Sequence, residues 1–160
     1  MHDIVVYRQK RGLGYPDAAK LLRRAAKTAL KAQGVRDDCI INIMLTDDAG
    51  IRAINLEQRG VDQPTDVLSF PLNELAEGAF DPAACECDPE TGKLLLGDMV
   101  LDLERCAAQG DEYGHGFARE LSYLTVNSVL HLLGYDHLDE GARKRRMRER
   151  EEAIMEVLGL

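Results

Sequence analysis

Apolar and polar positions along the chain predict short strands that alternate with helices. Four runs rich in apolar and β-branched residues are typical of strands: 3–7, 39–45, 67–70 and 94–102. Apolar residues recur with helical spacing from Pro16 to Gln33, where Gly34 provides a stop. A second helix is expected before Gly60, with Thr46 as its cap. We therefore expect strands and helices in alternation, without an internal repeat.

The C-terminal part of the chain predicts the helix at the centre of the fold. From about His115 to Leu133 the residues are apolar around most of a helix, which indicates a helix that runs through the core. Asp139 is expected to cap a last helix that continues to Leu158. A chain of 160 residues has the usual length of one domain, roughly 100–200 residues. The order of elements predicts a single α+β domain, 1–160, in which a mixed sheet of about four strands packs with helices.

The charge distribution singles out one segment as different from the rest. The net charge of −8 argues against nonspecific affinity for nucleic acid, because Lys and Arg supply most of that binding. Residues 73–92 include six acidic residues and neither Lys nor Arg, and we expect an acidic surface loop at about 72–93. Basic residues gather at 8–27 and 143–150, where a local basic surface and an ordinary solvated helix face are both open interpretations.

Neither a membrane segment nor a disulfide framework is predicted. No apolar run approaches the ~20 residues of a membrane span, and the N-terminus lacks the apolar stretch of a signal peptide. We therefore expect a cytoplasmic protein without a membrane partner. The four cysteines lack the spacing of a disulfide framework and are expected to be reduced. Cys85 and Cys87 lack the second pair of ligands that a closed metal site needs.

The segment from Asn127 to His137 predicts a metal site. Residues four apart share one side of a helix, so the side chains of Asn127 and His131 point the same way. Gly134 is expected to end the helix, and the turn at Asp136 would return His137 toward the point that His131 faces. A lone His on an apolar helix is usually a core residue, but the turn and the second His favour a metal or former metal site. Its third candidate ligand, Asn127, offers a neutral, hard oxygen where zinc prefers imidazole or thiolate.

Three ordered segments carry more specific information. They read RGVD at 59–62 followed by PTDVLSFP at 64–71, LGDMV at 96–100, and LHLLGYDH at 130–137. Together, over nearly the whole chain, they resemble the bacterial YbeY family of metal-dependent endoribonucleases of ribosome maturation. The family signature has three histidines, and its first falls at Asn127. The resemblance therefore implies a zincin-like fold whose central helix carries a site for one Zn²⁺ ion, with binding weakened by Asn127.

The resemblance also implies a function and its partners. It implies a zinc-dependent, single-strand-specific endoribonuclease that processes the 3′ end of small-subunit ribosomal RNA, with ribosomal RNA and the small ribosomal subunit and its proteins as partners. A zinc ion lowers the pKa of bound water to about 7, which supplies hydroxide for attack on a phosphodiester. The motif match assigns Arg59 as the catalytic residue that stabilises phosphate charge, although spacing alone indicates a surface arginine at a helix end. Asp136 would orient a ligand imidazole, or serve only as a turn residue.

Two other functions stay open. Because of Asn127, the chain can be interpreted as a noncatalytic ribosome-assembly factor that keeps the fold and the RNA surface. A metal-dependent hydrolase with a different substrate is a weaker alternative. It would need a Glu directly after the first ligand position as general base, and Ser128 stands there.

Four other residues are given structural interpretations. Gly97 is expected to mark a bulge or a close approach of the central helix, with Asp98 directed toward the cleft. Thr65 and Asp66 precede a strand and are interpreted as residues that shape its start.

Overall fold

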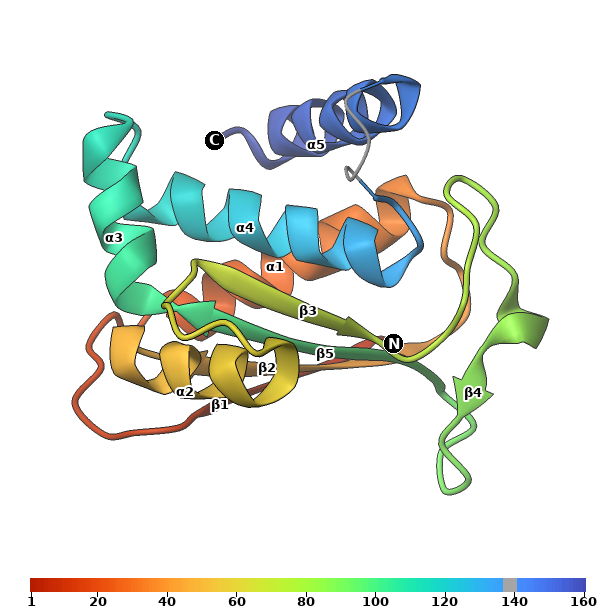
Figure 1. Ribbon diagram of the computed structural model, residues 1–160. Coiled ribbons are helices and arrows are strands. Elements are labelled where there is room, and N and C mark those ends of the chain that lie inside the picture. The colour runs from red at the N-terminus through yellow and green to blue at the C-terminus, as the bar shows by residue number, and fades with distance from the viewer. Residues whose placement is uncertain (137–140) are drawn as a thin grey trace.

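A computed structural model describes residues 1–136 and 141–160 and contains one mixed sheet (Figure 1). Its strands are β1 (Asp3–Arg8), β2 (Cys39–Thr46), β3 (Val67–Pro71), β4 (Glu86–Cys87) and β5 (Leu94–Asp102). The strand order is β1-β2-β5-β3, in which β1, β2 and β5 run parallel and β3 runs antiparallel to β5. The short β4 also pairs with β5. The mixed sheet predicted from the sequence is confirmed, with β4 added to its four expected strands.

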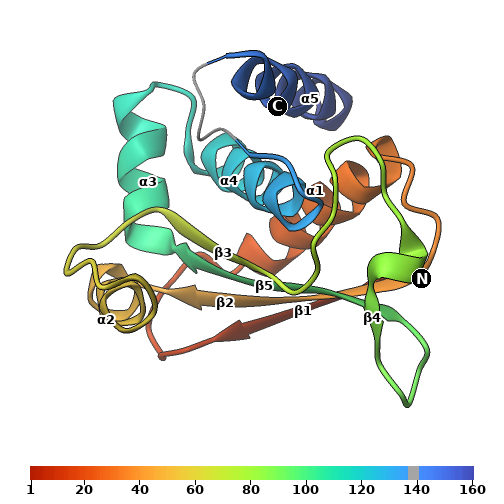
Figure 2. The same cartoon turned by 45° about the vertical axis from the view of Figure 1, so that its right-hand side comes forward.

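Helices cover both faces of this sheet. In the described residues they are α1 (Ala18–Ala32), α2 (Asp48–Arg59), α3 (Leu103–Glu112), α4 (Phe117–Leu132) and α5 (Ala142–Leu158). Figures 1 and 2 show α1 and α4 side by side on one face, α5 on the outer side of α4, and α2 on the opposite face. None of these helices is both long enough and apolar enough to cross a bilayer. The α+β fold with α4 as its central helix is therefore confirmed.

The main core lies between the sheet, α1 and α4. Leu22 and Leu30 of α1 and Val126 and Leu130 of α4 are fully buried there. Burial of each such side chain contributes on the order of 2 kcal/mol. A smaller cluster on the opposite face holds α2 through Ile51. Apolar packing therefore fixes α4 and α2, the two helices that carry predicted site residues.

The start of α2 differs from the prediction. Asp47, rather than Thr46, caps the helix, because its carboxylate accepts the Gly50 N–H at 2.9 Å. Thr46 instead ends β2, and its hydroxyl contacts the side chain of Gln9. A carboxylate also suits the positive end of a helix better than a hydroxyl. The cap predicted for the last helix, Asp139, lies outside the described residues.

The acidic segment from 72 to 93 has some regular structure. It contains a 3₁₀ turn at Pro82–Ala84 and the short β4. The side-chain amide of Asn73 donates to the Leu95 carbonyl at 2.8 Å, and its oxygen accepts the Glu86 N–H at 3.0 Å. These bonds hold the segment beside β5.

Candidate functional site

A cleft of about 820 Å³ opens beside α4. It is lined by every residue of β3, by one side of α4 and the turn after it, and by residues from α2, α5 and the acidic segment. Arg59, Asn127, His131 and Asp136 all line this cleft. The structure thus brings four predicted site residues together. The fifth, His137, lies outside the described residues.

Asn127 and His131 share the side of α4 that faces the cleft. Both are half-buried, whereas Ser128, Val129 and Leu130 between them are buried. One helical turn separates the carboxamide from the imidazole, so both project into the same space. Their placement agrees with the expectation from their spacing.

The C-terminal end of α4 turns through Gly134, whose φ is 97°. The Gly134 N–H donates to the His131 carbonyl at 3.1 Å and the Tyr135 N–H donates to the Leu130 carbonyl at 3.0 Å, which is the pattern of a Schellman cap. A Cβ at position 134 would lie 2.1 Å from the Leu75 carbonyl oxygen. Gly134 therefore ends the helix as predicted, and it also lets the acidic segment close one wall of the cleft.

The same turn sets the tautomer of His131. The His131 Nδ1 lies 3.0 Å from the carbonyl oxygen of Tyr135. A carbonyl can only accept, so Nδ1 carries the hydrogen and Nε2 of the neutral ring carries the lone pair. Metal-binding histidines commonly donate their other ring N–H to a carbonyl in this way. His131 therefore fits a zinc ligand through Nε2, and Asn127 adds only a neutral oxygen beside it.

The possible metal donors at the cleft come from α4 and from the turn that follows it. Asp136 is half-buried and lines the cleft. Within residues 1–136 and 141–160, no three His, Cys, Asp or Glu side chains are grouped so as to hold a metal ion. The donors that α4 directs into the cleft are one imidazole and one carboxamide, and the third predicted ligand, His137, lies outside the described residues.

Arg59 reaches the cleft from the C-terminal end of α2. Its Nη1 donates to Asn55 Oδ1 at 3.3 Å, and Asn55 Nδ2 donates to the Gln63 carbonyl at 2.9 Å. Asn55 is buried, so it ties the guanidinium to the loop that follows α2. A guanidinium has five N–H donors, and this single bond leaves donors for the oxygens of an anion.

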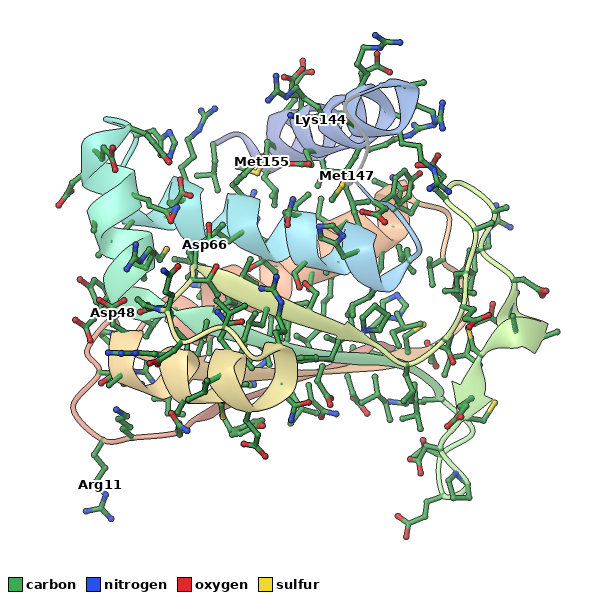
Figure 3. The ribbon with its side chains drawn as sticks, in the orientation of Figure 1. Arg11, Asp48, Asp66, Lys144, Met147 and Met155 are labelled. Carbon is green, nitrogen blue, oxygen red and sulfur yellow. The ribbon has the colours of Figure 1, made fainter. Side chains whose placement is uncertain are left out.

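The strand β3 is joined to its neighbours by side chains at the cleft. Ser69 Oγ lies 2.6 Å from Ser128 Oγ and links the strand to α4. The Asp66 carboxylate accepts the Val67 N–H at 2.7 Å and the Gln109 Nε2–H at 3.2 Å, at the start of β3 (Figure 3). Asp66 therefore shapes the start of the strand, as interpreted from the sequence.

Sequence reasoning did not assign to the cleft several polar residues that line it, among them Tyr123, Lys144 and Arg148. Partial burial, followed by a hydrogen bond to Glu151, raises the pKa of Tyr123, so its hydroxyl stays protonated at neutral pH. Lys144 and Arg148 belong to the basic run 143–150. Their spacing of four, which puts them on one side of a helix, was the signal that could have found them.

The expectation for Asp98 was wrong. Its carboxylate accepts a hydrogen bond from Asn42 Nδ2 at 3.1 Å on the neighbouring strand. Asp98 is paired with Phe70 on the face of the sheet that α2 covers, and it is not among the residues that line the cleft. Gly97 does mark a close approach of the central helix, since a Cβ there would lie 3.1 Å from Leu132 Cδ2 on α4, and 2.3 Å from the Phe70 carbonyl oxygen on β3. All four cysteines are free thiols.

Comparisons with known proteins agree on one family. The family model described as Endoribonuclease YbeY matches residues 4–159. An Endoribonuclease YbeY from Acetivibrio thermocellus is 41% identical over 141 residues, which cover 88% of this chain and 86% of the relative. One from Clostridium acetobutylicum is 48% identical over 141 residues and covers 84% of each chain. The solution structure of TM1509 from Thermotoga maritima has a TM-score of 0.60 at 24% identity, covers 96% of this chain and 87% of that chain, and supports the same fold.

Proposed function

The chain belongs to the YbeY endoribonuclease family, and on this basis we propose that it is a zinc-dependent endoribonuclease that cleaves single-stranded RNA in ribosome maturation. The observation that carries the proposal is a single cleft that joins Asn127, His131 and Arg59. The first two are possible metal donors, and the third is suited to a phosphate. Phosphodiester hydrolysis assisted by a metal uses both kinds of group in one cavity.

The residues of α4 and the turn after it would hold the ion. His131 would bind through Nε2, because the Tyr135 carbonyl keeps the hydrogen on Nδ1. Asn127 would add its carboxamide oxygen, and His137 is the proposed third ligand. When bound, zinc supplies Lewis acidity that activates water and polarises a phosphoryl oxygen. Asp136, which also lines the cleft, is proposed to orient a ligand imidazole.

Arg59 is proposed to bind the phosphate that reacts. Its bond to Asn55 restricts where the guanidinium can lie, while its other N–H groups remain donors. Negative charge grows on the phosphate oxygens during hydrolysis, and a charge-assisted hydrogen bond from Arg59 would stabilise it. Because this bond strengthens as charge develops, it would lower the barrier more than it tightens substrate binding.

The proposed substrate is ribosomal RNA, with cleavage at the 3′ end of the small-subunit RNA, in the cytoplasm. The proposed partners are this RNA and the small ribosomal subunit with its proteins. Two observations support an RNA substrate: the relatives are named endoribonucleases, and Lys144 and Arg148 border the cleft even though the net charge of the chain is −8. Local positive charge is what phosphate contacts require.

Asn127 favours a second candidate function, a noncatalytic ribosome-assembly factor. A carboxamide binds zinc more weakly than an imidazole does. A cleft with a weakened metal site would still present Arg59, Lys144 and Arg148 to RNA. This protein would bind small ribosomal subunits without cleaving RNA.

Cleavage of RNA by the purified protein tests the proposal. We expect zinc-dependent cleavage of a single-stranded RNA and not of a duplex of the same sequence, with a loss of about 100-fold or more in His131→Ala. A matched control is His115→Ala, because this imidazole pairs with Glu120 at 2.7 Å outside the cleft, and its loss should leave cleavage unchanged. Equal cleavage by His131→Ala and the unmodified protein would exclude a mechanism in which His131 binds the metal. Binding to small subunits without zinc and without cleavage would support the assembly factor.

A further inference from the structure

The strand β3 presents a backbone edge to the cleft. It is the last strand in the order β1-β2-β5-β3, and within the described residues no strand pairs with its outer edge. Every residue of β3 lines the cleft. An edge of this kind offers backbone N–H and C=O groups that a ligand can pair with.

The pairing of β3 with β5 shows which backbone groups point outward. The Asp102 N–H donates to the Asp66 carbonyl at 2.9 Å, and the Leu72 N–H donates to the Leu96 carbonyl at 3.1 Å. In an antiparallel pair such hydrogen-bonded positions alternate along the strand. Positions 68 and 70 therefore also point their backbone groups toward β5, and positions 67, 69 and 71 point theirs toward the outer edge.

Ser69 supplies the hydrogen-bond donor on this edge. The outward N–H of Val67 is already bound by the carboxylate of Asp66 at 2.7 Å. Pro71 has no N–H, and proline is tolerated in an edge strand at an outward position of this kind. Within the described strand, the outer edge therefore presents one N–H group that is not held by a side chain, at Ser69, next to the Ser69 carbonyl oxygen.

We propose that the outward N–H and C=O of Ser69 bind the edge of an unpaired nucleobase of the RNA strand in the cleft. This inference rests on the proposed ribonuclease function. Each base carries a donor and an acceptor side by side on its Watson–Crick edge or an equivalent edge, so the backbone N–H and C=O of one residue can pair with different bases. In a duplex these edges are occupied by the partner strand. The contact at Ser69 therefore gives a physical reason for selectivity toward single strands.

Basic side chains from two helices line the cleft beside this edge. Arg59 lines the cleft from the end of α2, and Lys144 (Figure 3) and Arg148 line it from α5, so cations from two elements can contact phosphates of a strand laid along β3. Four acidic side chains also line the cleft: Asp66, Glu74, Asp136 and Glu151. Asp66 is engaged by Val67 and Gln109, which reduces its effect on a bound strand.

Hydrogen exchange of the unmodified protein tests the inference directly. The probe is a 2′-O-methyl oligonucleotide of eight uridines, which has no free 2′-OH, measured against the free protein by NMR. We expect the Ser69 amide to exchange about fivefold or more slowly in the complex. The Val67 amide is the internal control, because Asp66 already binds it. Binding of the oligonucleotide without any change at Ser69 would overturn the inference and leave the ribonuclease proposal standing.

A pair of substitutions at one position separates the backbone from the side chain. Ser69→Pro removes the outward N–H and leaves the bonds to β5 in place, whereas Ser69→Ala removes only the hydroxyl that contacts Ser128. We expect Ser69→Pro to bind the oligonucleotide about fivefold more weakly than Ser69→Ala does. An abasic site at the bound nucleotide should weaken binding to Ser69→Ala and not to Ser69→Pro. Equal affinities of the two variants would overturn the inference.

Two further outcomes distinguish this inference from the function on which it rests. If no oligonucleotide binds the unmodified protein, both the inference and the ribonuclease proposal fail. If an extended peptide of alternating Ser and Val slows exchange at Ser69 and the oligonucleotide does not, the edge binds protein strands instead, and the nucleobase contact is excluded.

Discussion

Polar groups gather at two places in this fold, and the two places differ in what they face. At the cleft, Asn127 and His131 line an open space of about 820 Å³. At the junction of α2 and α3, the buried carboxyl group of Asp102 faces that of Asp48, a partly exposed residue at the first turn of α2 (Figure 3). Burial, followed by a hydrogen bond to Asp48, raises the pKa of Asp102 to about 8. The groups at the cleft can meet a ligand, whereas Asp102 lies in the interior, where its raised pKa favours the protonated carboxyl group.

The comparison shows that access of a ligand to the side chains, rather than their polarity, distinguishes a binding site from a structural contact. Both places use polar side chains at helix ends beside the sheet. Asp102 is fully buried and caps α3 by accepting the Arg105 N–H at 3.2 Å. His131 is only half-buried, with one ring nitrogen held by a carbonyl. Substitutions at the cleft should therefore change activity more than stability, and substitutions at the junction should do the reverse.

Removal of the Arg59 guanidinium should have the largest effect on activity. If Arg59 stabilises charge on the reacting phosphate, Arg59→Ala should lower kcat/KM for RNA cleavage about 100-fold to 1000-fold, with little change in Tm. The matched control is Arg52→Ala on the same helix, which removes an exposed ion pair with Asp62 at 2.7 Å. Arg52→Ala should cleave RNA normally. Similar losses of kcat/KM in both variants would show that the effect comes from a disturbance of α2 and not from removal of the Arg59 guanidinium.

An imidazole at position 127 should have the next largest effect, on zinc affinity. Asn127→His adds a borderline-soft nitrogen where the chain offers a hard oxygen, and we expect zinc to bind at least about tenfold more tightly. Competition with a chelating dye measures the affinity, and elemental analysis after dialysis gives the stoichiometry. Asn127→Ala is the control for simple loss of the carboxamide. Near-stoichiometric zinc in both the unmodified protein and Asn127→His would show that the carboxamide is a sufficient ligand.

Sequence reasoning succeeded where a local pattern determines the structure. The spacing of Asn127 and His131 and the stop at Gly134 predict one side of a helix and its end, and both are as expected. It failed for Asp98, because the face of a strand depends on register, which one strand alone does not reveal. For Arg148, the spacing from Lys144 indicates one side of a helix, but only the packing of α5 on α4 shows that this side faces the cleft.

The carboxyl pair could be recognised only from the structure. Asp48 and Asp102 are far apart in the sequence, and each alone is an ordinary acidic residue at a helix start. Their meeting depends on how α2 and α3 pack at the end of the sheet. Long-range contacts of this kind leave no spacing pattern in one sequence.

Replacement of Asp102 by a neutral residue should change the free energy of unfolding by an amount that depends on pH. Because the pKa of Asp102 is about 8 in the folded protein and near 4 in the unfolded chain, folding takes up a proton between these values. The free energy of unfolding therefore falls as pH rises from about 4 to 8. Asp102→Asn keeps the cap of α3 and removes this loss, so at pH 9 it should be more stable by about 2 kcal/mol, or ~5 °C in Tm.

Thermal unfolding at pH 5 and pH 9 measures this effect at the junction. The gain of Asp102→Asn should be large at pH 9 and small at pH 5. Asp111→Asn, at an exposed position of α3, should show no such difference. A gain that is equal at both pH values would mean that the carboxyl pair does not take up a proton on folding.

Removal of the hydrogen bond between the Ser69 and Ser128 hydroxyls should have the smallest effect. Ser128→Ala removes the partner of Ser69 at 2.6 Å, but Val126 and Leu130 keep α4 packed. We expect a loss of about 1 kcal/mol, or ~3 °C in Tm, and a change in cleavage below about twofold. The double variant with Ser69→Ala should cost little more than either single one, because both remove the same hydrogen bond. A tenfold loss of cleavage would instead mean that this bond aligns Asn127 and His131. A substitution at the cleft would then change stability and activity together.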